Sequence, residues 1–355
     1  MASPVPDPAL IPSSDSVSRF RADLGTIWPG AIDAETARLG IAVSGGPDSL
    51  ALLLLAAMAL PGRVEAATVD HRLRAASAQE AAQVAAVCAR LGVPHATLPV
   101  DVAEGNVQAE ARSARYAALA GWAADRGLAA IATAHHADDQ AETLVMRLNR
   151  ASGVAGLAGA RARGAVPGAR LDLLRPVLGW RRSDLGAVVD SAGLAAAQDP
   201  SNADPRFDRA RIRAALAGAD WLDVAAIAQS AGHLADADAA IEWAAAMEYR
   251  QMVKKEPFGL LYRPYAPRAI VLRVIGRIVR ELDGEEPRGG AVARLFDALV
   301  DGRPSSIGNL VVRPNASGWS FAKAPRSRCP QARLTASPAD QRDPPPTPTC
   351  LPRVT

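Results

Sequence analysis

The sequence predicts an α/β protein: an N-terminal domain built on a parallel β-sheet, followed by a smaller, mostly helical domain. Between residues 41 and 149, short strand-like runs alternate with longer helical patterns, which is typical of a parallel sheet covered on both faces. Beyond about residue 216 the pattern becomes mainly helical. A length of 355 residues with 49% hydrophobic content favours two domains over one.

The expected strands and helices follow from these patterns in chain order. The four predicted strands of the first domain lie at 40–43, 63–70, 95–101 and 129–136. The four helices that alternate with them lie at 49–60, 77–91, 107–126 and 138–149. Downstream we expect a glycine-rich flexible loop, a strand, a helix, a long Ala-rich helix, a mainly helical stretch and a β-hairpin, at 152–170, 171–178, 181–193, 217–248, 263–310 and 307–321.

These patterns predict four parts of the chain. They are a flexible N-terminus, an α/β domain, a mainly helical subdomain that ends in the hairpin, and a proline-rich disordered tail, at 1–15, 16–215, 216–325 and 326–355.

Composition excludes several classes of protein. The net charge of +3 is too small for a polycation, and nearly all basic residues are arginine. Cys88, Cys329 and Cys350 are far apart, which argues against a disulfide framework, a zinc ribbon and a cysteine-held iron–sulfur cluster. The N-terminus lacks the pattern of a secretory signal, and the longest apolar run, 50–61, is too short to cross a bilayer. We therefore expect a cytoplasmic protein without membrane contact.

A glycine-rich turn, "SGGPDS", separates the first strand from the first helix. Main-chain N–H groups at such a helix N-terminus attract anions, and phosphate above all. Gly45 and Gly46 allow close approach, Ser44 and Ser49 add hydroxyl groups, and Asp48 suits Mg²⁺ held against a phosphate. A tight strand-to-helix turn with a Ser or Asp cap is the structural alternative.

The same hexapeptide resembles the S-G-G-x-D-S signature of the PP-loop ATP-pyrophosphatases. Four further segments, at 69–81, 106–119, 132–148 and 198–213, resemble the tRNA(Ile)-lysidine synthetase branch of that family. The resemblance implies a Rossmann-like sheet of the adenine nucleotide alpha hydrolase type, with 16–215 as the PP-loop catalytic domain and 216–325 as the tRNA-binding subdomain. It also implies an ATP site over the turn, formed by Ser44, Gly45, Gly46, Pro47, Asp48 and Ser49.

The resemblance extends the ATP site to two other segments. Asp70 and His71 follow the second strand, where a parallel sheet presents its ligands, although a capping or core-edge histidine is the alternative. Arg112 and Arg115 lie on one helix face, three residues apart, and the resemblance implies that they contact phosphate or adenylate. Solvated arginines on a surface helix are the alternative.

The block "HHADDQAET" supplies the expected lysine site. Asp139 and Glu142 form one acidic patch that suits an amino acid's ammonium groups, and in the resembled branch these positions bind lysine. His135 and Asp138 then line the nucleotide side. Acids in a first helical turn are also ordinary partners of the helix dipole, which is the alternative. The catalytic residues that we expect are Asp48, Arg115, His135 and Asp139.

Two basic stretches are candidates for RNA contact. Arg206, Arg209, Arg211 and Arg213 lie in "RFDRARIR", and a second cluster spans 302–328. Solvated charge is the alternative to an RNA-backbone footprint.

The implied reaction uses ATP and Mg²⁺ to adenylate the C2 oxygen of the wobble cytidine in tRNA(Ile) with a CAU anticodon. Free L-lysine then displaces AMP to give lysidine, so the tRNA reads AUA instead of AUG. Many short members of the branch look dimeric, so the resemblance makes a homodimer possible, although no seam in this sequence shows one. Two alternatives remain: a PP-loop 2-thiocytidine synthetase, which sulfur dependence would reveal, and a non-catalytic nucleotide- or RNA-binding protein, which would bind without turnover.

Overall fold

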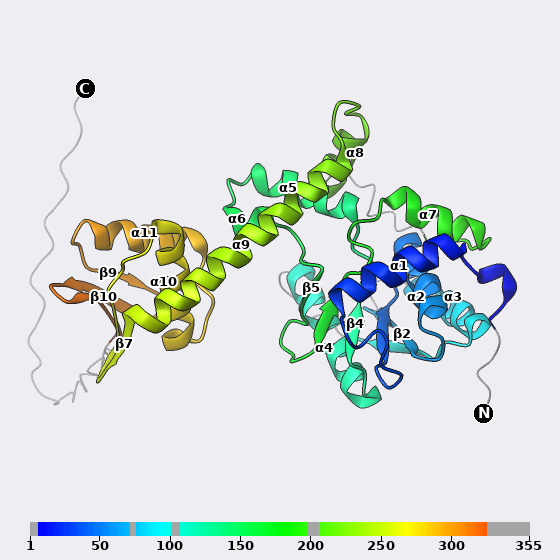
Figure 1. Ribbon diagram of the computed structural model, residues 1–355, viewed down its shortest axis with the longest axis horizontal. Coiled ribbons are helices and arrows are strands. Elements are labelled where there is room, and N and C mark those ends of the chain that lie inside the picture. The colour runs from blue at the N-terminus through cyan, green and yellow to red at the C-terminus, as the bar shows by residue number, and fades with distance from the viewer. Residues whose placement is uncertain (1–5, 72–75, 101–106, 198–205, 325–355) are drawn as a thin grey trace, which may run out of the picture. The chain divides into compact units, whose positions relative to one another are not determined.

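The computed structural model describes residues 6–71, 76–100, 107–197 and 206–324 (Figure 1). The chain divides into two compact units, residues 1–244 and 245–355, called unit 1 and unit 2 below. The boundary between the units falls within a single long helix, whereas the predicted domains meet at residue 215. The predicted domain bounds also assign functions to each part of the chain, and the division into compact units does not test them, so they stay a prediction.

A six-stranded sheet forms the centre of unit 1, with strand order β3-β2-β1-β4-β6-β5. All neighbouring strands are parallel except β5, which runs antiparallel to β6. The chain builds β1, β2 and β3 outward in one direction and then returns to place β4 on the other side of β1. Ligands of such sheets bind beyond the carboxyl ends of the strands at this reversal point. The strands are β1 (Leu39–Ala42), β2 (Val64–Asp70), β3 (His95–Pro99), β4 (Ala130–Ala132), β5 (Arg163–Ala165) and β6 (Asp172–Leu174).

Helices cover both faces of this sheet, which confirms the predicted class (Figure 1). One face carries a core shared with α1, α2, α3 and α7, and the other packs against α4. Helix α2 is buried along nearly its whole length, which explains its uninterrupted leucine and alanine run. The helices of unit 1 are α1 (Ser14–Ile27), α2 (Pro47–Ala59), α3 (Ala76–Leu91), α4 (Val107–Arg126), α5 (Ala137–Leu148), α6 (Val154–Leu157), α7 (Arg182–Ser191), α8 (Asp208–Ala217) and α9 (Val224–Met252), the last of which continues into unit 2.

The N-terminal segment is more ordered than its composition suggests. Residues 8–10 form a short 3₁₀ helix, and Leu10 is fully buried. The Asp7 carboxylate lies 2.8 Å from an Arg90 guanidinium nitrogen. The prolines in this segment leave no helical pattern in the sequence. In the structure, buried Leu10 and the ion pair with Arg90 hold the segment against the rest of unit 1.

Two downstream predictions were wrong in detail. The glycine-rich stretch at 152–170 is not one flexible loop, because it contains α6 and β5. The long Ala-rich helix predicted at 217–248 begins instead at residue 224, since α8 ends in a turn at Gly218.

Unit 2 combines helices with a five-stranded antiparallel sheet of order β7-β8-β11-β10-β9. The hairpin predicted at 307–321 is present as β10 and β11, which meet at residues 315 and 318 as expected. The sequence did not reveal the other three strands, because each is only three or four residues long. The strands are β7 (Val253–Glu256), β8 (Gly259–Tyr262), β9 (Ser305–Ile307), β10 (Leu310–Asn315) and β11 (Gly318–Lys323), and the helices are α10 (Arg268–Asp283) and α11 (Gly289–Val300).

Candidate active site

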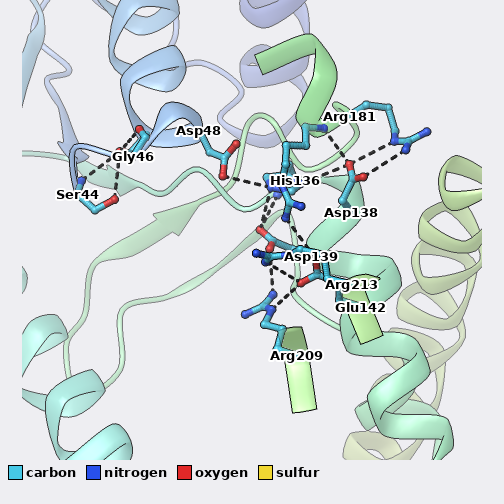
Figure 2. Close-up of polar contacts among 12 residues, drawn as sticks. Ser44, Gly46, Asp48, His136, Asp138, Asp139, Glu142, Arg181, Arg209 and Arg213 are labelled. Carbon is cyan, nitrogen blue, oxygen red and sulfur yellow. Dashed lines mark hydrogen bonds and ion pairs between the residues drawn. The ribbon is translucent and has the colours of Figure 1, made fainter. Parts of the chain in front are cut away.

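The turn after β1 is held in shape by its own side chains. The Ser49 hydroxyl donates to the Gly46 carbonyl at 2.9 Å and accepts from the Ser44 main-chain N–H at 3.1 Å (Figure 2). Gly45 has a φ of +84°, which favours glycine. Its carbonyl accepts from the main-chain N–H of Ala197 at 3.0 Å, so the segment after α7 braces the turn. The turn is therefore preformed, and Ser49 serves its geometry.

A cavity of about 770 Å³ opens over this turn, at the carboxyl ends of β1, β2 and β4. Ten of the residues predicted for the site line it, namely Ser44, Gly46, Pro47, Asp48, Ser49, His71, Arg112, Arg115, His135 and Asp139. Arg209, predicted for tRNA, also lines this cavity. Gly45 is buried behind the turn, and Asp70 ends β2 beside His71 without lining the cavity.

The cavity is rich in positive charge on the α4 side. Arg112 lies over the ring of Tyr116, with its guanidinium carbon 5.1 Å from the ring centroid. Partial burial, together with the neighbouring Arg112, lowers the pKa of Arg115. The pKa of His71 is lowered by burial and by Arg115. Cations next to a preformed anion turn suit a polyphosphate.

The two adjacent histidines after β4 differ in charge. Burial and several surrounding arginines, Arg175 foremost, lower the pKa of His135 to about 3. A His135 ring nitrogen lies 3.0 Å from the Thr133 hydroxyl. Burial also disfavours charge on His136, but Asp138 and Asp48 outweigh it and raise its pKa to about 9. His135 is therefore neutral and His136 is a buried cation at pH 7.

Sequence reasoning missed His136. Its ring lies 3.4 Å from Asp48, 3.6 Å from Asp138 and 3.7 Å from Asp139, so one imidazolium joins the turn after β1 to the first turn of α5 (Figure 2). The sequence shows His136 and the two acids that follow it at the start of a helix. It does not show that Asp48, far away in the chain, folds against the same histidine.

Asp138 is held by the start of α7. Arg181 donates to it through two guanidinium nitrogens, each at 3.2 Å, and the Arg182 main-chain N–H donates at 2.8 Å. Although burial raises the pKa of the Asp138 carboxyl, the neighbouring His136 imidazole and Arg181 guanidinium hold that pKa well below its usual range. Asp138, expected on the nucleotide side, thus ties α5 to α7.

Glu142 is almost completely buried among three arginines. Arg213, Arg209 and Arg182 donate to its carboxylate at 2.7, 2.8 and 3.2 Å (Figure 2). Burial raises its pKa, but the bonds from Arg213 and Arg209 outweigh burial and lower it overall. Arg209 also donates to Asp139 at 3.0 Å. The acidic patch is therefore present, and it is neutralised by arginines from α8 and α7.

The four arginines predicted for tRNA separate into two groups. Arg209 and Arg213 turn toward the acids of α5, as described above. Arg206 and Arg211 are exposed, and Arg211 pairs with Asp208. Their spacing in "RFDRARIR" did not show which helix face meets α5. The second basic stretch is divided too, because Arg303 pairs with Asp301 and Arg326 and Arg328 lie outside the described residues.

A second cavity, of about 510 Å³, lies on the other side of this cluster. Asp138, Glu142 and Asp223 supply negative charge to its wall, and three arginines supply positive charge. Its apolar wall comes from the turn between α8 and α9. The arginines are Arg181, Arg182 and Arg213, and the apolar residues include Leu216, Leu222 and Val224. The first two turns of α5 thus contribute Asp139 to one cavity and Asp138 and Glu142 to the other.

Asp48 fits the role of a magnesium ligand. Its Oδ1 atom is buried and has no hydrogen-bond partner in the part of the chain that the structure describes. Mg²⁺ bound to a nucleotide commonly takes one or two carboxylates and otherwise phosphate oxygens and water. The described residues contain no group of three or more His, Cys, Asp or Glu side chains that could hold a metal ion alone.

The cysteines and the helix lengths relate to the sequence arguments against cysteine-based sites and a membrane span. Cys88 is fully buried in the core, and burial raises the pKa of its thiol to about 12, as expected of a small core residue. Cys329 and Cys350 lie outside the described residues. None of the helices in the described ranges is both long and apolar enough to cross a membrane.

Comparison with known proteins identifies the relatives of this chain. Residues 18–219 match the PP-loop domain family. The chain is 47% identical over 319 residues to the tRNA(Ile)-lysidine synthase of Novosphingobium aromaticivorans, covering 89% of this chain and 96% of that protein. It is 41% identical to the tRNA(Ile)-lysidine synthase of Zymomonas mobilis, covering 81% and 89% respectively.

A solved structure shares the fold. The U34-tRNA thiolase NcsA from Methanococcus maripaludis, with its [4Fe-4S] cluster, superposes with a TM-score of 0.51 at 12% identity, over 62% of this chain and 78% of that one. At this identity the likeness concerns the fold alone. The family match and the extended identity to curated relatives together place this chain in the tRNA(Ile)-lysidine synthase family of PP-loop enzymes.

Proposed function

We propose that this protein uses ATP to join free L-lysine to C2 of the wobble cytidine of a tRNA(Ile) whose anticodon is CAU. The product is lysidine, with AMP and pyrophosphate released. The observation that carries this proposal is the pair of cavities on either side of the first turn of α5. One cavity suits a nucleotide and an RNA base, and the other suits an amino acid.

In the first step ATP lies over the turn after β1. Main-chain N–H groups at the N-terminus of α2 and the guanidinium groups of Arg112 and Arg115 face the phosphates. The C2 oxygen of the cytidine attacks the α-phosphorus, and pyrophosphate leaves. Cations fixed beforehand stabilise the charge that builds on the phosphate oxygens.

The cytidine must leave its stack to reach this cavity. An anticodon base is single-stranded, so splaying it out costs about a few kcal/mol at most. Neutral His135 can offer the base or the adenine a hydrogen bond without adding charge.

Mg²⁺ held at Asp48 would neutralise phosphate charge. The unpartnered Asp48 Oδ1 supports this assignment. His136 positions the carboxylate from the other side, with 3.4 Å between its Nε2 and Asp48 Oδ2.

In the second step lysine enters from the second cavity. The carboxylates of Glu142 and Asp139 orient an ammonium group of the lysine. That group replaces one of the arginines that now bind these carboxylates. The side-chain amine, with a pKa of about 10.4, must lose its proton before it attacks C2. AMP then leaves and carries the former C2 oxygen with it.

The test separates the two steps with two isosteric variants. Wild-type protein, incubated with ATP, labelled lysine and tRNA(Ile) transcript, should incorporate lysine. Asp48→Asn should abolish pyrophosphate release and retain tRNA affinity. Glu142→Gln should still transfer AMP to the tRNA while lysine incorporation falls at least ~100-fold, since removal of one charged partner costs about 3–5 kcal/mol in a buried pair.

Asp125→Asn, at an exposed acid of α4, is the matched control and should behave as wild type. Normal lysine incorporation by Glu142→Gln would contradict the lysine-site assignment. Sulfur dependence would favour a thiocytidine synthetase, and binding without turnover would favour a non-catalytic protein.

A further inference from the structure

One arginine of α8 contacts the residues of both cavities. Arg209 lines the first cavity, the one over the turn after β1. Its Nε donates to Glu142, which lines the second cavity, at 2.8 Å. A terminal nitrogen of the same guanidinium donates to Asp139 at 3.0 Å (Figure 2). A single cation therefore lies between the proposed place of the phosphates and the proposed place of lysine.

The other two arginines on Glu142 do not share this position. Arg213 and Arg182 line the second cavity, and neither lines the first. Their side chains are 30% and 35% exposed, against 45% for Arg209. If Arg209 turned away, Glu142 would keep two cationic partners, so no buried charge would be left alone. Arg209 is thus the partner that Glu142 can lose at the least cost.

Helix α8 is joined to α5 by charge and not by a hydrophobic core. No residue of α8 is buried, and none belongs to a hydrophobic core of the described residues. Besides Arg209 and Arg213, α8 contributes Asp208, which accepts from Arg150 at 2.7 Å just beyond the end of α5. Movement of one arginine side chain therefore disturbs no apolar packing and leaves other ion pairs between the two helices in place.

A triphosphate in the first cavity would compete with the acids of α5 for Arg209. Arginine binds phosphate and carboxylate with the same two-pronged geometry, and a triphosphate brings more negative charge than one carboxylate. Arg112 and Arg115 already face the same cavity from α4. With Arg209 on a phosphate, Asp139 would lose the one arginine that bonds it in the described part of the chain. Glu142 would lose one of three, which leaves both acids better able to bind an ammonium group.

We propose that Arg209 makes lysine binding depend on the nucleotide. Without ATP it occupies Asp139 and Glu142, and with ATP it moves to a phosphate and vacates them. Naming the two ligands as ATP and lysine rests on the proposed function. Lysine then binds after ATP, in the order in which the two reaction steps consume them. By linkage, lysine tightens the binding of ATP by the same factor.

The test measures the Kd for lysine by calorimetry, without tRNA, in the absence and presence of saturating ATP and Mg²⁺. ATP should lower the lysine Kd of wild-type protein at least about fivefold, the lower end of typical coupling between sites. Without ATP, Arg209→Gln should bind lysine at least about fivefold more tightly than wild type, and the coupling should fall below about twofold. The same variant should bind ATP more weakly. Arg209→Lys, which keeps the charge, should restore part of the coupling.

The matched control is Arg150→Gln, which removes another ion pair to α8 from an arginine that lines neither cavity. It should show the wild-type coupling. A purely structural role for Arg209 predicts that Arg209→Gln weakens lysine and ATP binding together, and that result would overturn the inference. Unchanged unfolding midpoints establish that the variants fold.

The outcomes distinguish this inference from the proposed function. If wild type incorporates lysine into tRNA but binds it equally well with and without ATP, the exchange of Arg209 is wrong and the reaction stands. If ATP and lysine are coupled through Arg209 but no lysine enters the tRNA, the reaction is wrong and the exchange stands. Absence of lysine binding under both conditions would overturn the two together.

Discussion

Two adjacent histidines at this site have pKa values shifted in opposite directions. His135 and His136 are adjacent in sequence, yet arginines surround the first and carboxylates surround the second. The family resemblance suggested a function for His135, but it is the next residue, His136, whose ring lies 3.4 Å from Asp48. The direction of two side chains at a strand end depends on packing between segments far apart in the chain, and local sequence patterns do not contain it.

The neutral state of His135 should make stability depend on pH. Its pKa falls from 6.5 to about 3 on folding, so its contribution is fully present above pH 6.5 and is lost as the pH drops toward 3. One such proton removes at most about 1.4 kcal/mol per pH unit. His135→Gln should therefore lose less unfolding free energy than wild type between pH 6.5 and pH 4.5, measured by urea denaturation.

The control is His233→Gln, at an exposed position of α9, which should follow the wild-type profile. Equal losses in the His135 variant and in wild type would show that this imidazole is protonated without penalty in the folded protein.

At the scale of elements, the connection from β1 to α2 carries the most functional information. Its glycines, proline and acid identified the turn from sequence, and in the structure the turn starts α2 and lines the cavity at the carboxyl ends of the strands. The alternation of strands and helices was also readable, because β1 to β4 and α2 to α5 lie within a few residues of their predicted bounds. Short strands such as β7 and β9 were missed, since three or four residues form a strand only through their neighbours.

Gly45 and Gly46 should differ in their tolerance of a methyl group. Gly45→Ala forces a side chain into the left-handed region, which costs about 1–2 kcal/mol. Gly46 has a φ of −72°, and the nearest atom to an added Cβ is the Ser44 hydroxyl at 3.7 Å. Without nucleotide, urea denaturation should therefore show Gly45→Ala destabilised and Gly46→Ala close to wild type. Equal destabilisation would mean that the turn is not held in its observed shape before ATP binds.

At the scale of the whole molecule, the described residues form two hydrophobic cores in unit 1 and one in unit 2, and no residue belongs to more than one of them. All residues that line the cavity over the turn after β1 belong to unit 1. The reversal of strand order that places this cavity could be expected once the strands alternated with helices. The ion pairs between Glu142 and the arginines of α7 and α8 could not be expected, because pairing of charges far apart in the chain has no local sequence signature.

ATP should consequently protect unit 1, and not unit 2, against hydrogen exchange. A ligand at 100 times its Kd stabilises the unit that binds it by about 2.7 kcal/mol. Hydrogen exchange should slow at the starts of α2 and α5 in the presence of ATP and remain unchanged in β10 and β11. Equal protection of both units would show that nucleotide binding is coupled to unit 2.

The most direct test of the account follows one oxygen atom through the reaction. If the cytidine C2 oxygen attacks the α-phosphorus of ATP held over the turn after β1, that oxygen must depart with AMP when lysine attacks. A tRNA(Ile) carrying ¹⁸O at C2 of the wobble cytidine should yield AMP with ¹⁸O in its phosphate, detected by mass spectrometry. Lysine incorporation with unlabelled AMP would contradict an adenylated cytidine, and with it the role that we assign to the turn.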